Sequence, residues 1–259
     1  MNEDQIPVGN DYLNLIWSQD EAVEKCTDRR IAELGRKAPS CLTALGTALS
    51  HIDRLASCFY GCHGGDHLIE YLTGRVCGLS RSAIRLTRFA NYDEALLLIR
   101  TIGEMANLVQ LFSINSQDLF AWKNSSKTVR ITNFGPAAVR RRLEELKQLV
   151  HLDRDWYGSL CEWAAHPTPA TKPNAFNSLG IPCAAPQLQD EGVIVCLNEL
   201  ARVLCIYIPP VVSLLPLTKD QKTSILREIR VLPESLGGVM LDKLPEIWAQ
   251  HRLPHSIQH

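Results

Sequence analysis

Apolar side chains recur three and four residues apart along almost the whole chain. This spacing places them on one face of an α-helix, whereas a half-buried strand needs strict alternation. Only the run Val193 to Val195 is typical of a strand, and a lone strand has nothing to pair with. The sequence therefore predicts an all-α fold, a single bundle of about seven to nine helices.

Two segments organise the predicted bundle. The run 93–112 is apolar almost all round, which is typical of a central helix. The run 167–189 contains five prolines and predicts a long loop. Further helices are expected at 10–34, 40–59, 66–88, 136–150, 153–166 and 192–208, from 218 onward and from 245 onward, with a polar connector at 113–135. Either Asp153 or Asp155 can start the helix that ends at 166.

Length and composition limit the class of protein. No shift in composition divides the 259 residues, so we expect one helical domain, 1–259, with 218–259 left open as a C-terminal appendage. A formal net charge of -1 shows that the chain is no bulk polycation able to hold nucleic acid or membranes non-specifically, so any contact with nucleic acid must be local. The run 203–217 is too short to span a bilayer, and 1–10 lacks the basic and apolar runs of a signal peptide. Nine cysteines without framework spacing indicate free thiols, so we expect a cytoplasmic protein without a membrane partner.

The common catalytic motifs are absent from the sequence. It contains no P-loop, dinucleotide-binding glycine fingerprint, nucleophile elbow, H-E-x-x-H or C-x-x-C. Their absence argues against Walker-type nucleotide hydrolysis, nicotinamide chemistry, α/β-type serine hydrolysis and the common zinc modules. No cofactor is expected, and the function has to be sought in individual polar side chains.

Polar side chains interrupt the apolar run 93–112 along one line. A turn of 100° per residue places Arg100, Glu104 and Asn107 within one narrow arc. A guanidinium and a carboxylate away from water must pair, so one interpretation is a structural ion pair that sets helix register. The other makes Arg100 a phosphate ligand oriented by Glu104, because a planar guanidinium binds phosphate bidentately.

A histidine ends the expected helix 153–166. His166 precedes Pro167, and a residue before proline leaves the helical region. A helix C-terminus favours the imidazolium, so His166 is a candidate general acid or base, or an anion ligand, with Tyr157 as a supporting residue. The plainer alternative is a histidine that hydrogen-bonds the last carbonyls of the helix. The sequence leaves open whether His166 and Arg100 share a pocket.

Arg81, Arg85 and Arg88 form a basic stripe opposite the apolar face of their helix. Such a stripe is either a solvated face or a surface for an RNA backbone or an acidic partner. A second basic cluster, 140–142, precedes two glutamates, and we expect the two groups to pair at helical spacing.

A cysteine and histidine pattern lies between the second and third expected helices. The residues follow the order C-x-x-x-C-H-x-x-x-H among three glycines: Cys58, Cys62, His63 and His67. Thiolates and imidazoles are ligands that Zn²⁺ prefers. Adjacent ligands strain one coordination sphere, so we interpret the segment first as an interhelical turn and keep a zinc site as the alternative.

Two stretches of the chain resemble the HEPN superfamily. They are YDEALLLIRTIGE at 92–104 and YGSLCEWAAHP at 157–167, and the resemblance covers 66–167. That superfamily comprises helical bundles, including nucleotide-binding modules and ribonucleases of bacterial toxin and phage-defence systems. The resemblance implies a tendency to dimerise and a polar set consisting of Arg100, Glu104 and His166. The ribonuclease motif of that superfamily, an arginine four to six residues before a histidine on one helix, is absent here.

Two hypotheses for the function follow. In the first, the chain is a HEPN-like protein that binds RNA or a nucleotide through Arg100 and His166. As an enzyme it would be a metal-independent ribonuclease-type effector of a bacterial defence or stress system. In the second, it is a non-catalytic helical scaffold or regulatory subunit in which Arg100 and Glu104 form a structural pair. A homodimer or a protein partner is compatible with both.

Overall fold

The computed structural model describes residues 6–37, 39–62, 64–166 and 185–230. Within these residues every regular element is a helix and no strand is present, which confirms the all-α fold. The elements number ten α-helices, a 3-10 helix and a π-helical segment, slightly more than expected. They are α1 (Asn10–Lys37), α2 (Pro39–Leu55), η1 (Cys58–Tyr60), α3 (Leu68–Arg88), α4 (Tyr92–Ile114), α5 (Ser116–Asn124), α6 (Lys127–Phe134), α7 (Pro136–Glu145), α8 (Arg154–Leu160), η2 (Cys161–Ala165), α9 (Asp190–Leu214) and α10 (Lys219–Arg230).

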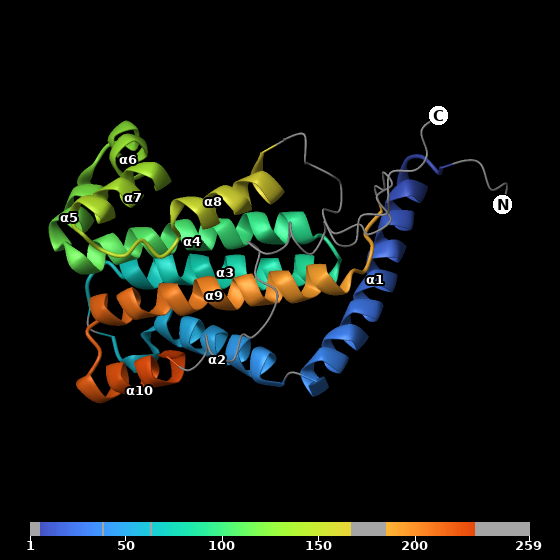
Figure 1. Ribbon diagram of the computed structural model, residues 1–259, viewed down its shortest axis with the longest axis horizontal. Helices are drawn as coiled ribbons and strands as arrows, with labels where there is room; N and C mark the ends of the chain where they lie inside the picture. Colours follow the sequence, from blue (N-terminus) through green and yellow to red (C-terminus); the bar gives the residue numbers. More distant parts are fainter. Residues whose placement is uncertain (1–5, 38, 63, 167–184, 231–259) are drawn as a thin grey trace.

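Two apolar helices form the centre of the bundle. α4 and α9 lie side by side and begin at the same end, and α3 packs against both (Figure 1). The backbone N–H of Gln189 donates to the hydroxyl of Tyr92 at 3.0 Å, which joins the starts of the two helices. The predicted central helix is therefore present as α4.

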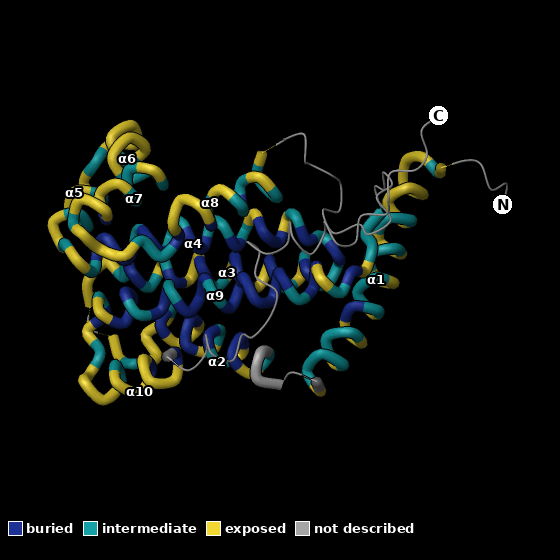
Figure 2. The backbone as a smooth tube through the Cα atoms, in the orientation of Figure 1, coloured by how far each residue is buried: buried dark blue, intermediate teal, exposed yellow. Residues whose placement is uncertain are grey.

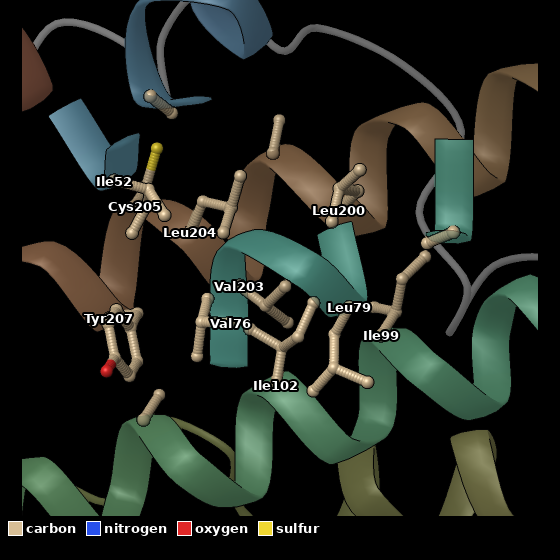
Figure 3. Close-up of a cluster of buried hydrophobic side chains, with 14 of the residues drawn as sticks. Ile52, Val76, Leu79, Ile99, Ile102, Leu200, Val203, Leu204, Cys205 and Tyr207 are labelled. Atoms are coloured by element: carbon tan, nitrogen blue, oxygen red, sulfur yellow. The ribbon is translucent and has the colours of Figure 1, made fainter. Parts of the chain in front are cut away.

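The hydrophobic core lies between α2, α3, α4 and α9. Figure 3 shows side chains from all four helices meeting there, among them Ile52, Val76, Ile102 and Leu204. Buried residues concentrate on these helices, whereas α5, α6 and α7 are exposed over much of their surface (Figure 2). Removal of apolar side chains from water is the main force that holds such a bundle together.

The predicted polar connector 113–135 is wrong, because it contains α5 and α6. Neither helix has a fully buried residue, so the periodicity that reveals core helices is weak in both. Their starts are set by caps instead. The side chain of Asn115 accepts from the backbone N–H of Gln117 at 3.1 Å, and that of Ser126 accepts from Val129 at 3.4 Å.

Three predicted helix ends also differ clearly from the structure, and the first is that of the helix expected at 136–150, which ends at Glu145 as α7. α2 ends at Leu55, so Phe59 falls in η1 and is 62% exposed instead of buried. α9 continues past the expected end at 208, through Pro209 and Pro210. A proline inside a helix removes the hydrogen bond to the carbonyl four residues earlier and crowds that carbonyl. The last turn of α9 nevertheless stays helical, and its Val211 is buried in the bundle.

Two predicted helix starts and one predicted helix end are confirmed by the local structure. Thr218 and Gln221 form a reciprocal capping box, with N–H to side-chain oxygen distances of 2.8 and 3.2 Å. The carboxylate of Asp153 accepts from the N–H of Trp156 at 2.8 Å and starts α8. His166 is extended, with φ -126° and ψ 135°, as expected of a residue before proline.

Part of the predicted organisation lies outside the described residues. This holds for 167–184 of the expected loop, for 231–259 of the C-terminal segment and for the helix expected from 245. The described part of that segment is α10, and its Ile225 and Ile229 are buried against the bundle.

Among the described residues, α4 and α9 are long and apolar enough to cross a membrane. Of the most apolar 18-residue stretch in each helix, 61% is buried inside the bundle for α4 and 78% for α9. Core helices of soluble proteins have the same length and composition, so these two helices are weak evidence for a membrane span.

Candidate functional site

Asn107, the last residue of the polar arc on α4, fastens the segment that leads into α8. Its amide nitrogen donates to the carbonyl of Leu152 at 2.9 Å, and its oxygen accepts from the N–H of Leu152 at 3.0 Å. Gln110 adds a 2.6 Å hydrogen bond to the carbonyl of Leu149. These contacts tie the start of α8 to α4, and α8 and η2 run along α4 (Figure 1).

Arg100 and Glu104 form the predicted ion pair. Nη2 of Arg100 lies 3.2 Å from Oε1 of Glu104, and the two side chains are only 17% and 19% exposed. Nη1 of Arg100 also lies 3.6 Å from Sγ of Cys161, the first residue of η2. The arginine therefore links α4 to the π-helical segment.

A second guanidinium reaches the same place from α7. The Cζ atoms of Arg140 and Arg100 lie 4.1 and 5.4 Å from the centre of the Tyr157 ring. Both distances are within the range of a cation–π interaction. We call this group, Arg100, Glu104, Arg140 and Tyr157, the two-arginine site.

The charges of the two-arginine site are not balanced. Glu104 is the carboxylate that pairs with Arg100, and no ion pair of Arg140 is found in the described part of the chain. Three buried atoms of the site also have no hydrogen-bond partner within the described residues: Nε of Arg100, Nη1 of Arg140 and Oε1 of Glu104, whose contact with Arg100 is close enough for an ion pair but not aligned as a hydrogen bond. Two guanidinium groups against one carboxylate leave one positive charge uncompensated, which favours an anion.

The phenol of Tyr157 is protonated at neutral pH. Burial raises the pKa of Tyr157 to about 12, with contributions from the side chain of Cys161 and the charge of Glu104, while Arg100 acts in the opposite direction. A protonated phenol is a hydrogen-bond donor. The two-arginine site therefore presents donors from three side chains beside the single acidic side chain of Glu104.

His166 lies next to this site along the chain. It is exposed at the end of η2, and its backbone N–H donates to the carbonyl of Cys161 at 3.0 Å. Cys161 is the residue whose sulfur faces Arg100. The structure thus brings Arg100, Glu104 and Tyr157 together and places His166 one π-helical turn from their neighbour Cys161. Single π-helical turns inside helices are frequent at functional sites.

Of the three arginines in the basic stripe on α3, one is paired with carboxylates of α1. Arg88 donates to both oxygens of Asp28 at 2.7 Å and lies 3.0 Å from Glu24, so it holds α1. Arg81 and Arg85 are exposed and have no ion pair among the described residues. They line a shallow surface hollow of about 470 Å³.

The structure also gathers part of the cysteine and histidine pattern. The ligand atoms of Cys58, Cys62 and His67 all lie within 4.8 Å of one another. His63 lies outside the described residues.

The sequence patterns do not predict two residues at or beside the two-arginine site, Arg140 and Cys161. The cluster 140–142 was expected to pair with the following glutamates, and Arg141 and Arg142 do pair with Glu145, at 3.9 and 3.5 Å. Arg140 does not, since it lies three residues before the buried Leu143 and so on the inner side of α7. That spacing is the signal that separates it from its neighbours.

No family model matches the sequence, and comparisons with curated proteins and with solved structures find no match either. The resemblance to the HEPN superfamily therefore stays a prediction. The function has to be argued from the geometry and chemistry of the site.

Proposed function

We propose that the chain binds phosphate groups of RNA or of a nucleotide at the two-arginine site. The observation that carries the proposal is the guanidinium of Arg140, which lies over Tyr157 without a carboxylate partner among the described residues. A guanidinium presents paired N–H donors that match phosphate oxygens. Arg100 and the phenol of Tyr157 add donors beside it.

The exposed pair Arg81 and Arg85 supports binding of a longer RNA. Exposed arginines without carboxylate partners contact the phosphate backbone and release its counterions. Aromatic platforms do not line their hollow, so contacts there are with backbone and not with bases. We include in the proposal the HEPN-like role expected from the sequence, that of a cytoplasmic effector of a bacterial defence or stress system, acting as a homodimer or with a protein partner.

His166 is the candidate for chemistry at the bound phosphate. Cleavage of RNA by side chains needs a group that exchanges a proton near neutral pH, and an imidazole has that property. Tyr157 is not suited to act as the base, because its pKa is raised to about 12. In this form of the proposal Arg100 and Arg140 stabilise the charge that develops on phosphate, with Glu104 holding Arg100 in place.

Binding is tested by fluorescence anisotropy with a labelled single-stranded RNA and, separately, with a labelled adenine nucleotide. Arg140→Gln removes the charge and is expected to weaken binding by about tenfold or more, because charge-assisted hydrogen bonds are lost. The matched control is Arg141→Gln, one residue away, exposed and paired with Glu145. Equal affinities of the two variants would contradict the proposal.

Cleavage is tested separately with a labelled RNA pool, with and without EDTA. Degradation that survives EDTA and disappears in His166→Ala supports metal-independent cleavage by side chains. Binding without degradation keeps the phosphate site and removes the catalytic role of His166.

The alternative function is that of a non-catalytic scaffold or regulatory subunit. The contacts that favour it are those of Arg100 and Arg140, which also fasten α7, α8 and η2 to α4. Under this alternative, Arg140→Gln lowers the melting temperature, and neither RNA nor nucleotide binds the wild-type protein.

A further inference from the structure

The connection between α2 and α3 brings three soft ligands to one point. Cys58 lies in η1, Cys62 follows it, and His67 is the residue before the first turn of α3. Their two sulfur atoms and the imidazole nitrogen are all within 4.8 Å of one another, and Sγ of Cys62 lies 3.8 Å from Nε2 of His67. Both cysteines are exposed, so the point is open to solvent.

These separations suit a tetrahedral metal ion. Zinc–sulfur and zinc–nitrogen bonds of about 2.3 and 2.1 Å place tetrahedral ligands about 3.6 Å apart. The 3.8 Å between Cys62 and His67 is close to that value, and the upper limit of 4.8 Å is reduced by small side-chain rotations. Two thiolates and a neutral imidazole also balance the charge of a divalent ion.

A carboxylate behind the histidine is a separate observation that points to a metal. Oε1 of Glu70 lies 3.4 Å from Nδ1 of His67. A carboxylate at one ring nitrogen holds the proton there and leaves the lone pair on the other, which here is the nitrogen that faces Cys62. The same order of carboxylate, histidine and metal is common in zinc proteins.

The backbone at this point is held in an unusual conformation. His67 has φ 50°, in the left-handed region that non-glycine residues seldom occupy. Asp66 forms an ion pair with Lys123 of α5 and accepts from the N–H of Leu68 at 3.3 Å. These contacts fix the turn that directs the imidazole toward the cysteines, and such strain is common where a site needs a defined geometry.

We propose that Cys58, Cys62 and His67 bind a Zn²⁺ ion, with Glu70 orienting the imidazole. Three protein ligands leave one tetrahedral position for water or another donor. Because the ligands come from both sides of the connection, the ion would join the segment after α2 to the start of α3. Residue 63 lies outside the described part of the chain, and no ligand role is assigned to it. The site is separate from the two-arginine site and does not depend on phosphate binding.

The test is a titration of the full-length chain, freed of metal and fully reduced, with Co²⁺ as the spectroscopic probe. Wild-type protein is expected to bind one Co²⁺ with thiolate-to-metal charge-transfer bands and the visible bands of a tetrahedral ion, and Zn²⁺ displaces it. Cys58→Ser and Cys62→Ser each remove about half of the charge-transfer intensity, because each removes one of two thiolates. His67→Asn, which tolerates the left-handed backbone, removes the tetrahedral signature.

Two further measurements keep the result independent of folding defects. Glu70→Gln retains all three ligands and is expected to weaken Zn²⁺ binding by about 10- to 100-fold. Zn²⁺ also raises the melting temperature of the wild-type protein and not that of Cys62→Ser. The matched control is Cys26→Ser, a partly exposed cysteine on α1 outside the cluster. Absence of cobalt absorption in the reduced wild-type protein, or an equal loss in Cys26→Ser, overturns the assignment.

Discussion

Single buried polar side chains determine where the two-arginine site can form. Asn107 is 3% exposed, and it satisfies both backbone groups of Leu152, which is itself fully buried. An unpaired backbone group in a core has a high energetic cost, so the amide specifies one register for the segment before α8. The position of Tyr157 relative to Arg100 follows from that register.

Asn107→Ala is expected to lower the free energy of unfolding by about 2 kcal/mol, because it leaves a buried N–H and a buried C=O without partners. Urea denaturation followed by circular dichroism measures the change. Asn124→Ala is the control, since that exposed amide bonds only a carbonyl of its own helix. Similar losses in the two variants would show that Asn107 has no special structural role.

A single carboxylate makes the attachment of α1 depend on pH. The hydrogen bonds from Arg88 lower the pKa of Asp28 below its ordinary value of 3.8, while partial burial acts in the opposite direction. A carboxyl group whose pKa is lower in the folded state contributes stability above its unfolded pKa and loses it as the pH falls through the folded pKa. The pair is nearly half exposed on the aspartate side, so its contribution is about 1 kcal/mol or less.

Asp28→Asn is accordingly expected to reduce stability at pH 7 and to have a shrinking effect below about pH 4. Urea unfolding across this pH range measures the difference between variant and wild type. Asp20→Asn, on the same helix and without an ion pair among the described residues, is the control. A difference that stays constant with pH would exclude the proposed linkage.

At the element scale, α4 and α9 pack closely against each other where both helices begin. A Cβ atom added to Gly192 would lie 2.6 Å from the ring of Tyr92, and Tyr92 is only 1% exposed. The same helix pair carries the hydrogen bond between Gln189 and Tyr92. A residue without a side chain is therefore required at this point for the two central helices to pack.

Gly192→Ala is expected to destabilise the protein by about 1–3 kcal/mol through overpacking, although alanine favours helices. The matched variant is Gly74→Ala on α3, where an added Cβ meets nothing within 4 Å. That variant is expected to stabilise by about 0.5–1 kcal/mol, because only helix propensity changes. Thermal unfolding of both proteins measures the sign, and stabilisation by both substitutions would contradict the packing argument.

Across the whole molecule, α10 belongs to the main core. Ile225 and Ile229 are 2% and 4% exposed in the cluster that contains residues of α2, α3, α4 and α9. The carboxylate of Glu228 also lies 3.0 Å from the imidazole of His51 on α2. The first part of 218–259 is thus packed as an integral helix of the bundle. Loss of its core contacts is therefore expected to destabilise the whole bundle.

Ile225→Ala is expected to lower the free energy of unfolding by about 2–4 kcal/mol within one cooperative transition. Leu226→Ala, at a neighbouring side chain that is 40% exposed, is expected to cost much less. Circular dichroism and tryptophan fluorescence, recorded on the same urea series, test the cooperativity. Two separate transitions would show that α10 unfolds as an independent appendage.

The features that depend on neighbours in the chain could be predicted before any fold was known. Helical periodicity, the capping box at Thr218, the start of α8 at Asp153 and the break at His166 all arise from contacts within four residues. The pairing of Arg100 with Glu104 belongs to the same group, since four residues make one helical turn. The helices α5 and α6 were missed because their surfaces have no buried face to generate a pattern.

The sequence by itself thus determined the helical class, most helix starts and the polar arc on α4, because local chemistry acts between residues that are close in the chain. The tertiary structure alone decided which of the arginines have a carboxylate partner among the described residues. Arg88 pairs with Asp28 across 60 residues, Arg141 with its own helix, and Arg140 meets Tyr157 on another helix. The physical reason is that the partner of a side chain depends on how whole helices pack, and packing is set by the shape of the entire core.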